Sequence, residues 1–239
     1  MITVVLNCYK RLEYLQEQIQ SIRNQTIQVD DIWIWYNKPE DSQQYDLSGL
    51  GCKVITCNHN FKFHGRFALG LLAQTEYVAF FDDDTIPGSN WFESCLHYLK
   101  QENLILGSTG VLYKGNGYDP HIKYGWNGVK NTELQYVDLV GHSWFMKRST
   151  LQYLWYEDPI SWDNGEDIQL SGFAYKYGRI KTAVPPHPEN NKNIWGSSNI
   201  SMQYGNDQQA SNKKTNHSLL RNKISNELLC NGYIKVIDR

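Results

Sequence analysis

The sequence lacks the features that mark several common classes of protein. Its five cysteines form no Cys-x-x-Cys pair of the kind used for zinc or redox work. No apolar run approaches the ~20 residues needed to cross a bilayer. An expected strand over residues 2–6 leaves no room for a signal peptide. We therefore expect reduced thiols in a cytoplasmic protein without a membrane span.

The chain also lacks a strong charge of one sign and a glycine-rich fingerprint. The formal net charge of its 239 residues is −2, so nothing indicates a surface that coats nucleic acid. The expected first strand ends in Asn7-Cys8-Tyr9-Lys10-Arg11, and no Gly-x-Gly-x-x-Gly sequence follows it. This absence argues against a plain dinucleotide-binding site.

What the chain does contain is an alternation of strands and helices over its first hundred residues. Apolar or β-rich runs predict strands at 2–6, 32–36, 53–57 and 77–81. Apolar residues at helical spacing predict helices at 12–22, 67–72 and 91–99. This order indicates an α/β fold with a mostly parallel sheet covered by helices.

The second half is less regular. Its patterns predict strands at 104–112, 136–146 and 180–184, helices at 167–177 and 219–229, and a Gly- and Tyr-rich loop at 115–128. Residues 190–214 are polar, and their composition fits either disorder or a mobile lid. A helical pattern follows them, so this stretch is internal.

The strongest local signal is an acidic cluster that ends an apolar strand, Phe80-Phe81-Asp82-Asp83-Asp84. Alternate residues of an extended segment point the same way, so Asp82 and Asp84 converge at the edge of the sheet where ligands bind. A hard divalent cation bridging to a diphosphate would satisfy these carboxylates. The alternative is a solvated acidic turn or a helix cap.

A haloacid-dehalogenase-like phosphatase also places Asp-x-Asp after an apolar strand. That motif closes the first strand of its domain and carries Thr or Val two residues after the second Asp. Here the cluster follows three earlier predicted strands, and Ile86 stands at that position. We keep the phosphatase as an alternative.

A second acidic signal is Gly165-Glu166-Asp167, which opens a predicted helix. Two acids at a helix start are stabilised by the helix dipole, so capping is one interpretation. The other is a catalytic base, which needs a carboxylate within hydrogen-bond reach of an acceptor hydroxyl.

These motifs in this order resemble GT-A glycosyltransferases. The likeness rests on the acidic cluster, Gly-His-Ser-Trp-Phe at 141–145 and Gly-Glu-Asp at 165–167, and covers roughly residues 1–190. It is similar to family-2-like enzymes and, more closely, to the exostosin-type family 64 domain and chlorella-virus glycosyltransferases. It implies a single domain, 1–239, with a smaller second sheet. Residues 1–100 would bind the nucleotide sugar, 101–190 the acceptor side, and 191–239 would form a lid loop and a C-terminal helix.

The resemblance implies a role for each candidate residue. Asn7, Tyr9 and Arg11 would line the base and ribose pocket, and Arg66 would lie beside the nucleotide and its phosphates. Asp82, with Asp83 beside it, would reach the ribose or a metal-bound water. Asp84 would bind Mn²⁺ (or Mg²⁺), which bridges the diphosphate of a donor such as a UDP-sugar. Asp167, next to Glu166, would be the base of an inverting transfer to a glycan or other hydroxyl acceptor.

Further candidates have alternatives that stay open. His187 is either a third metal ligand or structural, since imidazole binds manganese acceptably. His217 and Arg221 lie four residues apart, so they share a helix face that either clamps the diphosphate or is solvated. Within the 141–145 motif, His142 and Trp144 fall in the acceptor-side segment, although Trp144 is equally a core residue. Trp195 and Gly196 would belong to a loop that closes over the donor. A catalytically inactive sugar-nucleotide-binding domain is the other alternative, and for a viral protein the location would be the host cytoplasm.

Overall fold

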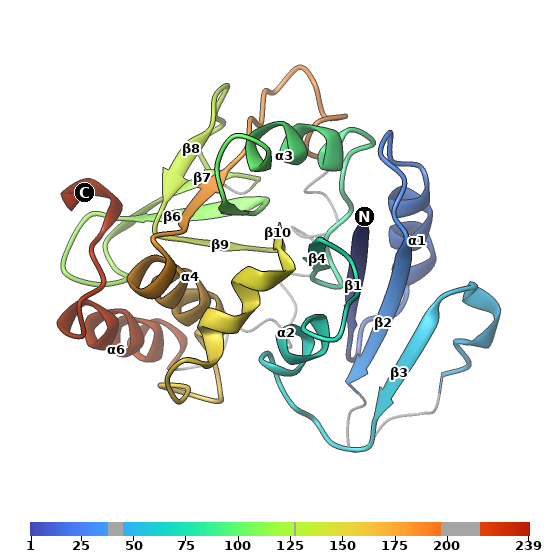
Figure 1. The fold of residues 1–239 in the computed structure, drawn as a ribbon, viewed down its shortest axis with the longest axis horizontal. Coiled ribbons are helices and arrows are strands. Elements are labelled where there is room, and N and C mark those ends of the chain that lie inside the picture. Colours follow the sequence, from blue (N-terminus) through green and yellow to red (C-terminus); the bar gives the residue numbers. More distant parts are fainter. Residues whose placement is uncertain (38–44, 127, 197–215) are drawn as a thin grey trace.

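Two sheets organise the chain in the computed structural model, which describes residues 1–37, 45–126, 128–196 and 216–239 (Figure 1). Within these residues, an eight-stranded sheet has the order β3-β2-β1-β4-β10-β5-β11-β8, and a three-stranded sheet has the order β7-β6-β9. The strands are β1 Ile2–Cys8, β2 Asp31–Asn37, β3 Lys53–Cys57, β4 Tyr77–Phe81, β5 Leu104–Leu106, β6 Thr109–Tyr113, β7 His121–Gly125, β8 Gln135–Val137, β9 Leu139–Gly141, β10 Ser143–Lys147 and β11 Lys181–Val184. The helices are α1 Leu15–Arg23, α2 Gly65–Gly70, α3 Trp91–Leu99, α4 Glu166–Gly178 and α6 His217–Cys230, with 3-10 turns η1 Ser48–Leu50, η2 Arg148–Trp155 and η4 Val236–Asp238.

The first four strands pair in parallel within the large sheet, as the sequence predicts. β1 pairs in parallel with β2 on one side and with β4 on the other, and β3 pairs in parallel with β2. All four strands therefore end at the same edge of the sheet. Because polar residues lie at the end of each strand or directly after it, their side chains collect at that edge.

Helices cover both faces of the large sheet, as alternate side chains of β1 illustrate. Val4 and Leu6 pack on the face that carries α1 and α3. Val5 packs on the opposite face, in a cluster that includes Phe67 of α2 and Leu170 of α4. Such burial on both faces accounts for the nearly continuous apolar runs of the strands.

The second half differs from the prediction in three places. The strand expected at 104–112 is two strands, β5 and β6, which belong to different sheets. Gly107 lies between them, where a Cβ atom would be 2.4 Å from Val140 Cβ. The strand expected at 136–146 is three, β8, β9 and β10, and the loop expected at 115–128 contains β7. Apolar runs alone do not reveal these breaks, because a run that changes sheets stays buried throughout.

The helix α6 packs against α4 and the small sheet in a third apolar cluster. Gly165, which precedes α4, has a φ of 85°, and a Cβ atom there would lie 2.4 Å from Ile224 Cδ1 of α6. Glycine is favoured at this position by its backbone conformation, and a larger residue would also have to displace the end of the Ile224 side chain. This close approach fixes the start of α4 against α6.

The structure also bears on the expected reduced thiols and on the expected absence of a membrane span. All five cysteines are free thiols, and Cys8, Cys57 and Cys95 are buried. Among the described helices, none has the length and apolar character needed to traverse a bilayer.

Candidate functional site

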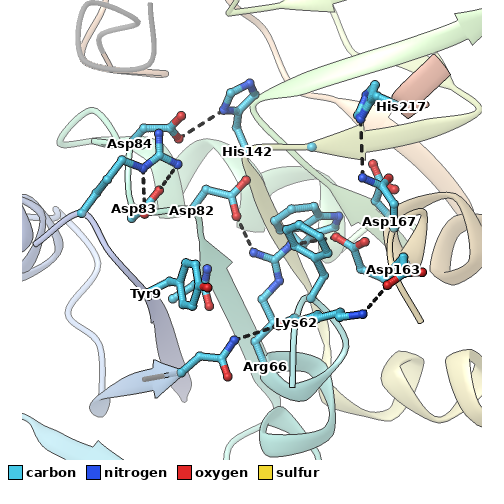
Figure 2. A pocket seen from close by; sticks show the side chains of 18 of the residues that line it. Tyr9, Lys62, Arg66, Asp82, Asp83, Asp84, His142, Asp163, Asp167 and His217 are labelled. Atoms are coloured by element: carbon cyan, nitrogen blue, oxygen red, sulfur yellow. Dashed lines mark hydrogen bonds and ion pairs between the residues drawn. The ribbon is translucent and has the colours of Figure 1, made fainter. Parts of the chain in front are cut away.

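A cavity of about 480 Å³ lies at the carboxyl ends of β1, β2 and β4 and reaches the first turns of α4 and α6 (Figure 2). This is the edge of an open α/β sheet at which ligands bind. Of the predicted site residues, His187 and the lid candidates Trp195 and Gly196 do not line it. Those that do include Asn7, Tyr9, Arg11, Arg66, Asp82, Asp83, Asp84, Glu166, Asp167, His217 and Arg221. The fold therefore brings the two acidic motifs to one cavity.

Asp82, Asp84 and His142 form a group with the geometry of a metal site. One ligand atom from each side chain lies within 4.8 Å of the others. Asp84 is buried and Asp82 is half-buried, so the group faces the cavity from its floor. Two carboxylates and an imidazole are ligands that suit a divalent cation such as Mn²⁺. The residues present therefore fit such an ion.

Strand pairing brings His142 to this group. β10 runs antiparallel to β4, and Asp82 N donates to His142 O at 3.0 Å. His142 has a φ of 62°, a left-handed conformation that few non-glycine residues adopt. Its Nδ1 lies 3.4 Å from Asp84 Oδ1. Burial alone would lower the pKa of His142, but the hydrogen bond and charge of Asp84 raise it.

His187 does not reach this group. It is fully buried, its Nδ1 lies 2.6 Å from Pro185 O, and its ring packs against Trp91 and Trp195. Burial lowers the pKa of His187 to about 4, so the ring is neutral at neutral pH. The structure thus places His142, and not His187, beside the two acids, and the metal role of His187 stays a prediction.

Arg11 holds the middle acid of the cluster. Its Nε donates to Asp83 Oδ2 at 3.0 Å, and its Nη2 donates to Asp83 Oδ1 at 2.7 Å. Burial raises the pKa of Asp83 to about 7, although the Arg11 guanidinium opposes that rise. This pair fixes the segment after β1 to the end of β4, on one wall of the cavity.

Arg66 joins the two acidic motifs across the cavity floor (Figure 2). Its side chain is buried, and its Nη1 donates to Asp82 while its Nη2 donates to Glu166 Oε1 at 3.0 Å. The guanidinium lies 4.3 Å from the centroid of the Trp144 ring, which is itself buried. Burial alone would lower the pKa of Arg66, but its carboxylate partners raise it. Trp144 therefore lies beneath Arg66 and also lines the cavity, and its acceptor-side role stays a prediction.

Asp167 receives a two-pronged ion pair from α6. Arg221 Nη1 donates to Asp167 Oδ1 at 3.1 Å, and Nη2 donates to Oδ2 at 2.7 Å. Arg221 Nη1 also lies 3.0 Å from Asn164 Oδ1, and His217 Nδ1 lies 3.5 Å from Asn164 Nδ2. Arg221 is only 7% exposed, so it is not part of a solvated helix face. It orients the predicted base.

Glu166 is the more deeply placed acid of the pair that opens α4. Burial, and after it the charge of the neighbouring Asp167, raise its pKa to about 7 against the opposing effect of Arg66 and Arg221. Asp167 Oδ1 accepts from Ile168 N at 2.8 Å in the first turn of α4, so part of the capping interpretation holds. The acids face the cavity and two arginines, so capping alone does not account for them.

The wall of the cavity at the ends of β1 and β2 carries uncharged polar groups, and two of them, Asn37 and Asn60, were not predicted from the sequence. Asn37, at the end of β2, donates from Nδ2 to Asn60 Oδ1 at 2.8 Å and accepts from Phe61 N at 2.9 Å. Asn60 Nδ2 in turn donates to the hydroxyl of Tyr9 at 3.2 Å. Like Asn7, Asn37 ends a predicted strand, and that position was the available signal.

Trp195 and Gly196 are held in place beside the segment that follows β4. Trp195 is 3% exposed, its Nε1 donates to Pro188 O at 2.9 Å, and its carbonyl accepts from Trp126 Nε1 at 2.9 Å. A Cβ atom on Gly196 would lie 2.2 Å from Ile86 O. These two residues are packed into the body of the protein, and residues 197–215 of the expected lid lie outside the described residues.

Comparisons with known proteins identify the family of the chain. The model of the glycosyl transferase family 2 matches residues 3–155, more than half of the chain. A search of curated protein sequences finds no match.

Solved structures of two proteins, S. aureus TarS and GalNAc-T7, are similar in fold. Residues 1–349 of S. aureus TarS align with a TM-score of 0.55 and 15% identity, covering 89% of this chain and 68% of that one. The same TarS segment in complex with UDP aligns at 0.55 and 16%, covering 78% and 58%. GalNAc-T7 with UDP, GalNAc and Mn²⁺ aligns at 0.61 and 12%, covering 78% of this chain and 42% of that one.

The fold and the family model agree on the broad assignment made from the sequence. The large mixed sheet with helices on both faces and the smaller second sheet are as the GT-A resemblance implies. The closer likeness to exostosin-type and chlorella-virus enzymes stays a prediction. The chain belongs to glycosyl transferase family 2 and has the GT-A fold.

Proposed function

We propose that this protein transfers a sugar from a nucleoside diphosphate, UDP in our proposal, to a hydroxyl group of an acceptor, with inversion at the anomeric carbon. The observation that carries the proposal is the single cavity onto which the acids after β4 and the acids opening α4 both face. The neighbouring structures that contain UDP, and in one case Mn²⁺, support the choice of donor and metal.

In this proposal the base and ribose of the donor occupy the wall formed by the ends of β1, β2 and β3. Asn7, Tyr9 and Arg11 lie there together with the Asn37–Asn60 pair. Amide and hydroxyl groups fixed by one another offer donors and acceptors at set positions, which suits the edge of a base. Residues 1–100 are then the donor half and residues 101–190 the acceptor half.

Asp82, Asp84 and His142 would hold a divalent cation beside the diphosphate. Such an ion, when bound, offsets the negative charge that develops on the departing nucleoside diphosphate. Arg66 keeps Asp82 in place from beneath, and Arg11 keeps Asp83 turned away to its own ion pair. The chain thus separates the acids available to a metal from the one that is already paired.

Asp167 would accept the proton of the acceptor hydroxyl as its oxygen attacks the anomeric carbon. Arg221 contacts both carboxylate oxygens and so fixes the plane of the group. Each carboxylate oxygen has more than one lone pair, so Oδ2 can still accept from a hydroxyl. Glu166 lies beside it and would orient the acceptor.

The residues of this cavity also argue against the two alternative functions, a phosphatase and an inactive binding domain. Family membership does not support a phosphatase with Asp82 as the nucleophile, and Asp82 is paired with Arg66 at the cavity floor. A catalytically inactive binding domain would keep the donor wall but would have no use for a buried Asp167–Arg221 pair, whose desolvation is costly.

A thermal-shift experiment with UDP and Mn²⁺ tests the proposal. A ligand that binds only the folded state at a hundred times its Kd adds about 2.7 kcal/mol. For a domain of this size we expect Tm to rise by about 5–10 °C. The rise should need both UDP and Mn²⁺, and Asp84→Asn should abolish the part that depends on Mn²⁺.

Asp158→Asn is the matched control, because Asp158 is exposed and lies outside the cavity. It should respond to UDP and Mn²⁺ as the unchanged protein does. An Asp84→Asn variant with the full Mn²⁺-dependent shift would remove Asp84 from the metal site. Absence of any shift with UDP would overturn the proposed donor.

A further inference from the structure

One tryptophan stands apart from the other seven. Trp162 is 57% exposed, and the remaining tryptophans are buried or half-buried. A single exposed apolar residue is ordinary, whereas contiguous exposed apolar surface rimmed by polar residues marks binding sites, so the neighbours of the ring matter. Trp162 belongs to the loop between η2 and α4, so its position relative to the cavity decides what it can do.

The loop carries Trp162 to the rim of the cavity. The next two residues, Asp163 and Asn164, line the cavity, and the acids Glu166 and Asp167 follow them. The ring centroid of Trp162 lies 5.0 Å from that of His64, which is buried. Trp162 therefore rests on His64 and stays open to solvent elsewhere.

A second segment meets this loop at the rim. Lys62 forms an ion pair with Asp163 (Figure 2). Phe61, which precedes Lys62, is 50% exposed, and Phe63, which follows it, lines the cavity. The exposed aromatic rings of Phe61 and Trp162 thus stand on two segments that are tied together beside the predicted base.

This surface has the chemistry of a carbohydrate site. The flat face of an indole suits the apolar face of a sugar ring, and its amphipathic character is the reason that Trp is common where apolar and wet surroundings meet. The carboxylate of Asp163 and the ammonium of Lys62 lie next to the ring and suit the hydroxyl groups of a sugar. An acyl chain would instead need a wider, uninterrupted apolar surface than two rings separated by an ion pair.

We propose that Trp162 is the platform for a sugar ring of a carbohydrate acceptor. The proposal deepens the function proposed above and rests on it. A sugar stacked on Trp162 lies next to the loop that leads directly into Glu166 and Asp167. Its neighbouring hydroxyl group is thereby presented to the predicted base, and the acceptor class is a saccharide and not a protein side chain or a lipid.

An array of immobilised oligosaccharides tests the proposal, with fluorescently labelled protein applied in the presence of UDP and Mn²⁺. The unchanged protein should bind a subset of the saccharides. Trp162→Ala should weaken that binding at least tenfold, because the removal of an aromatic anchor is a large loss at an interface. Trp162→Phe should keep most of it. Tyr156→Ala is the matched control, since Tyr156 is 52% exposed and lies outside the cavity.

The thermal shift with UDP and Mn²⁺ is measured on every variant and separates this proposal from the one on which it rests. Trp162→Ala should keep the full shift. Equal saccharide binding by Trp162→Ala and the unchanged protein overturns the platform. Absence of saccharide binding in a protein that shows the UDP shift also overturns it, as does binding of peptides or lipid vesicles alone. Saccharide binding that needs Trp162 without a UDP shift would keep the platform and overturn the donor assignment.

Discussion

The two halves of the molecule build their parts of the cavity in different ways. In residues 1–100, polar groups follow successive parallel strands, and neutral side chains such as Asn37, Asn60 and Tyr9 hold one another. In the second half, buried ion pairs hold the side chains in position. Arg221 of α6 pairs with Asp167, and 54 residues separate the two along the chain. The difference is one of charge and not of distance along the chain, because Asn60 and Tyr9 are themselves 51 residues apart, and the first wall contains the Arg11–Asp83 ion pair as well as its neutral contacts. The second wall should therefore be more sensitive to the loss of a single partner.

The largest expected effect is on stability and compares one residue from each wall. Arg221→Met leaves a buried carboxylate without its partner, which typically costs about 3–5 kcal/mol. Asn37→Ala leaves a neutral amide and a backbone N–H without theirs, which costs about 1–3 kcal/mol. Urea denaturation of both variants measures the two losses. If Asn37→Ala costs as much as Arg221→Met, the comparison between the walls fails.

The next effect concerns rate and binding. Asp167→Asn should lower transfer by about a hundredfold or more, the usual contribution of a general base, or about 2.7 kcal/mol in the barrier. Its affinity for UDP and Mn²⁺ should stay near that of the unchanged protein, because Asp167 belongs to the acceptor side.

Asn60→Ala should do the reverse and weaken UDP binding while changing the rate at saturating donor little. Calorimetry with UDP and Mn²⁺ gives the affinities, and hydrolysis of a UDP-sugar, with water as the acceptor, gives the rates. Unchanged hydrolysis by Asp167→Asn would remove it from the mechanism. A product that retains the anomeric configuration would also require a different role for it, because one displacement inverts the centre.

Counted per group and per pH unit, the smallest effect is a pH dependence to which each wall contributes one acid. Burial raises the pKa of Glu166 from 4.5, and that of Asp83 from 3.8, to about 7. Between the lower values and about 7 the folded protein holds protons that the unfolded chain has released. The free energy of unfolding should therefore fall as pH rises through this window, by up to about 1.4 kcal/mol per pH unit for each group.

Urea denaturation without divalent metal between pH 4.5 and 7.5 measures this slope. Glu166→Gln should remove its own share of the slope and leave the share of Asp83. A slope that is the same in Glu166→Gln and the unchanged protein would show that Glu166 does not hold the extra proton.

Particular residues show how much of the site could be predicted from the sequence. Asp82, Asp83 and Asp84 were found because a short apolar strand runs directly into them, and β4 and α3 have the predicted bounds. Glu166 and Asp167 were found because they open a helix. His142 was noticed, but nothing in its neighbours along the chain placed it beside Asp84. Trp162 and the Asn37–Asn60 pair carried no motif.

The sequence by itself determined the parallel first half, because apolar periodicity and short connections leave few ways to pair consecutive strands. It also determined which acids would stand at the sheet edge, because they follow buried strands directly. Only the tertiary structure decided that β10 lies antiparallel to β4, that His187 is buried away from the cavity, and that Arg221 pairs with Asp167. These contacts join residues distant in the chain. Their energy comes from burial and charge pairing in the assembled fold, which no local pattern encodes.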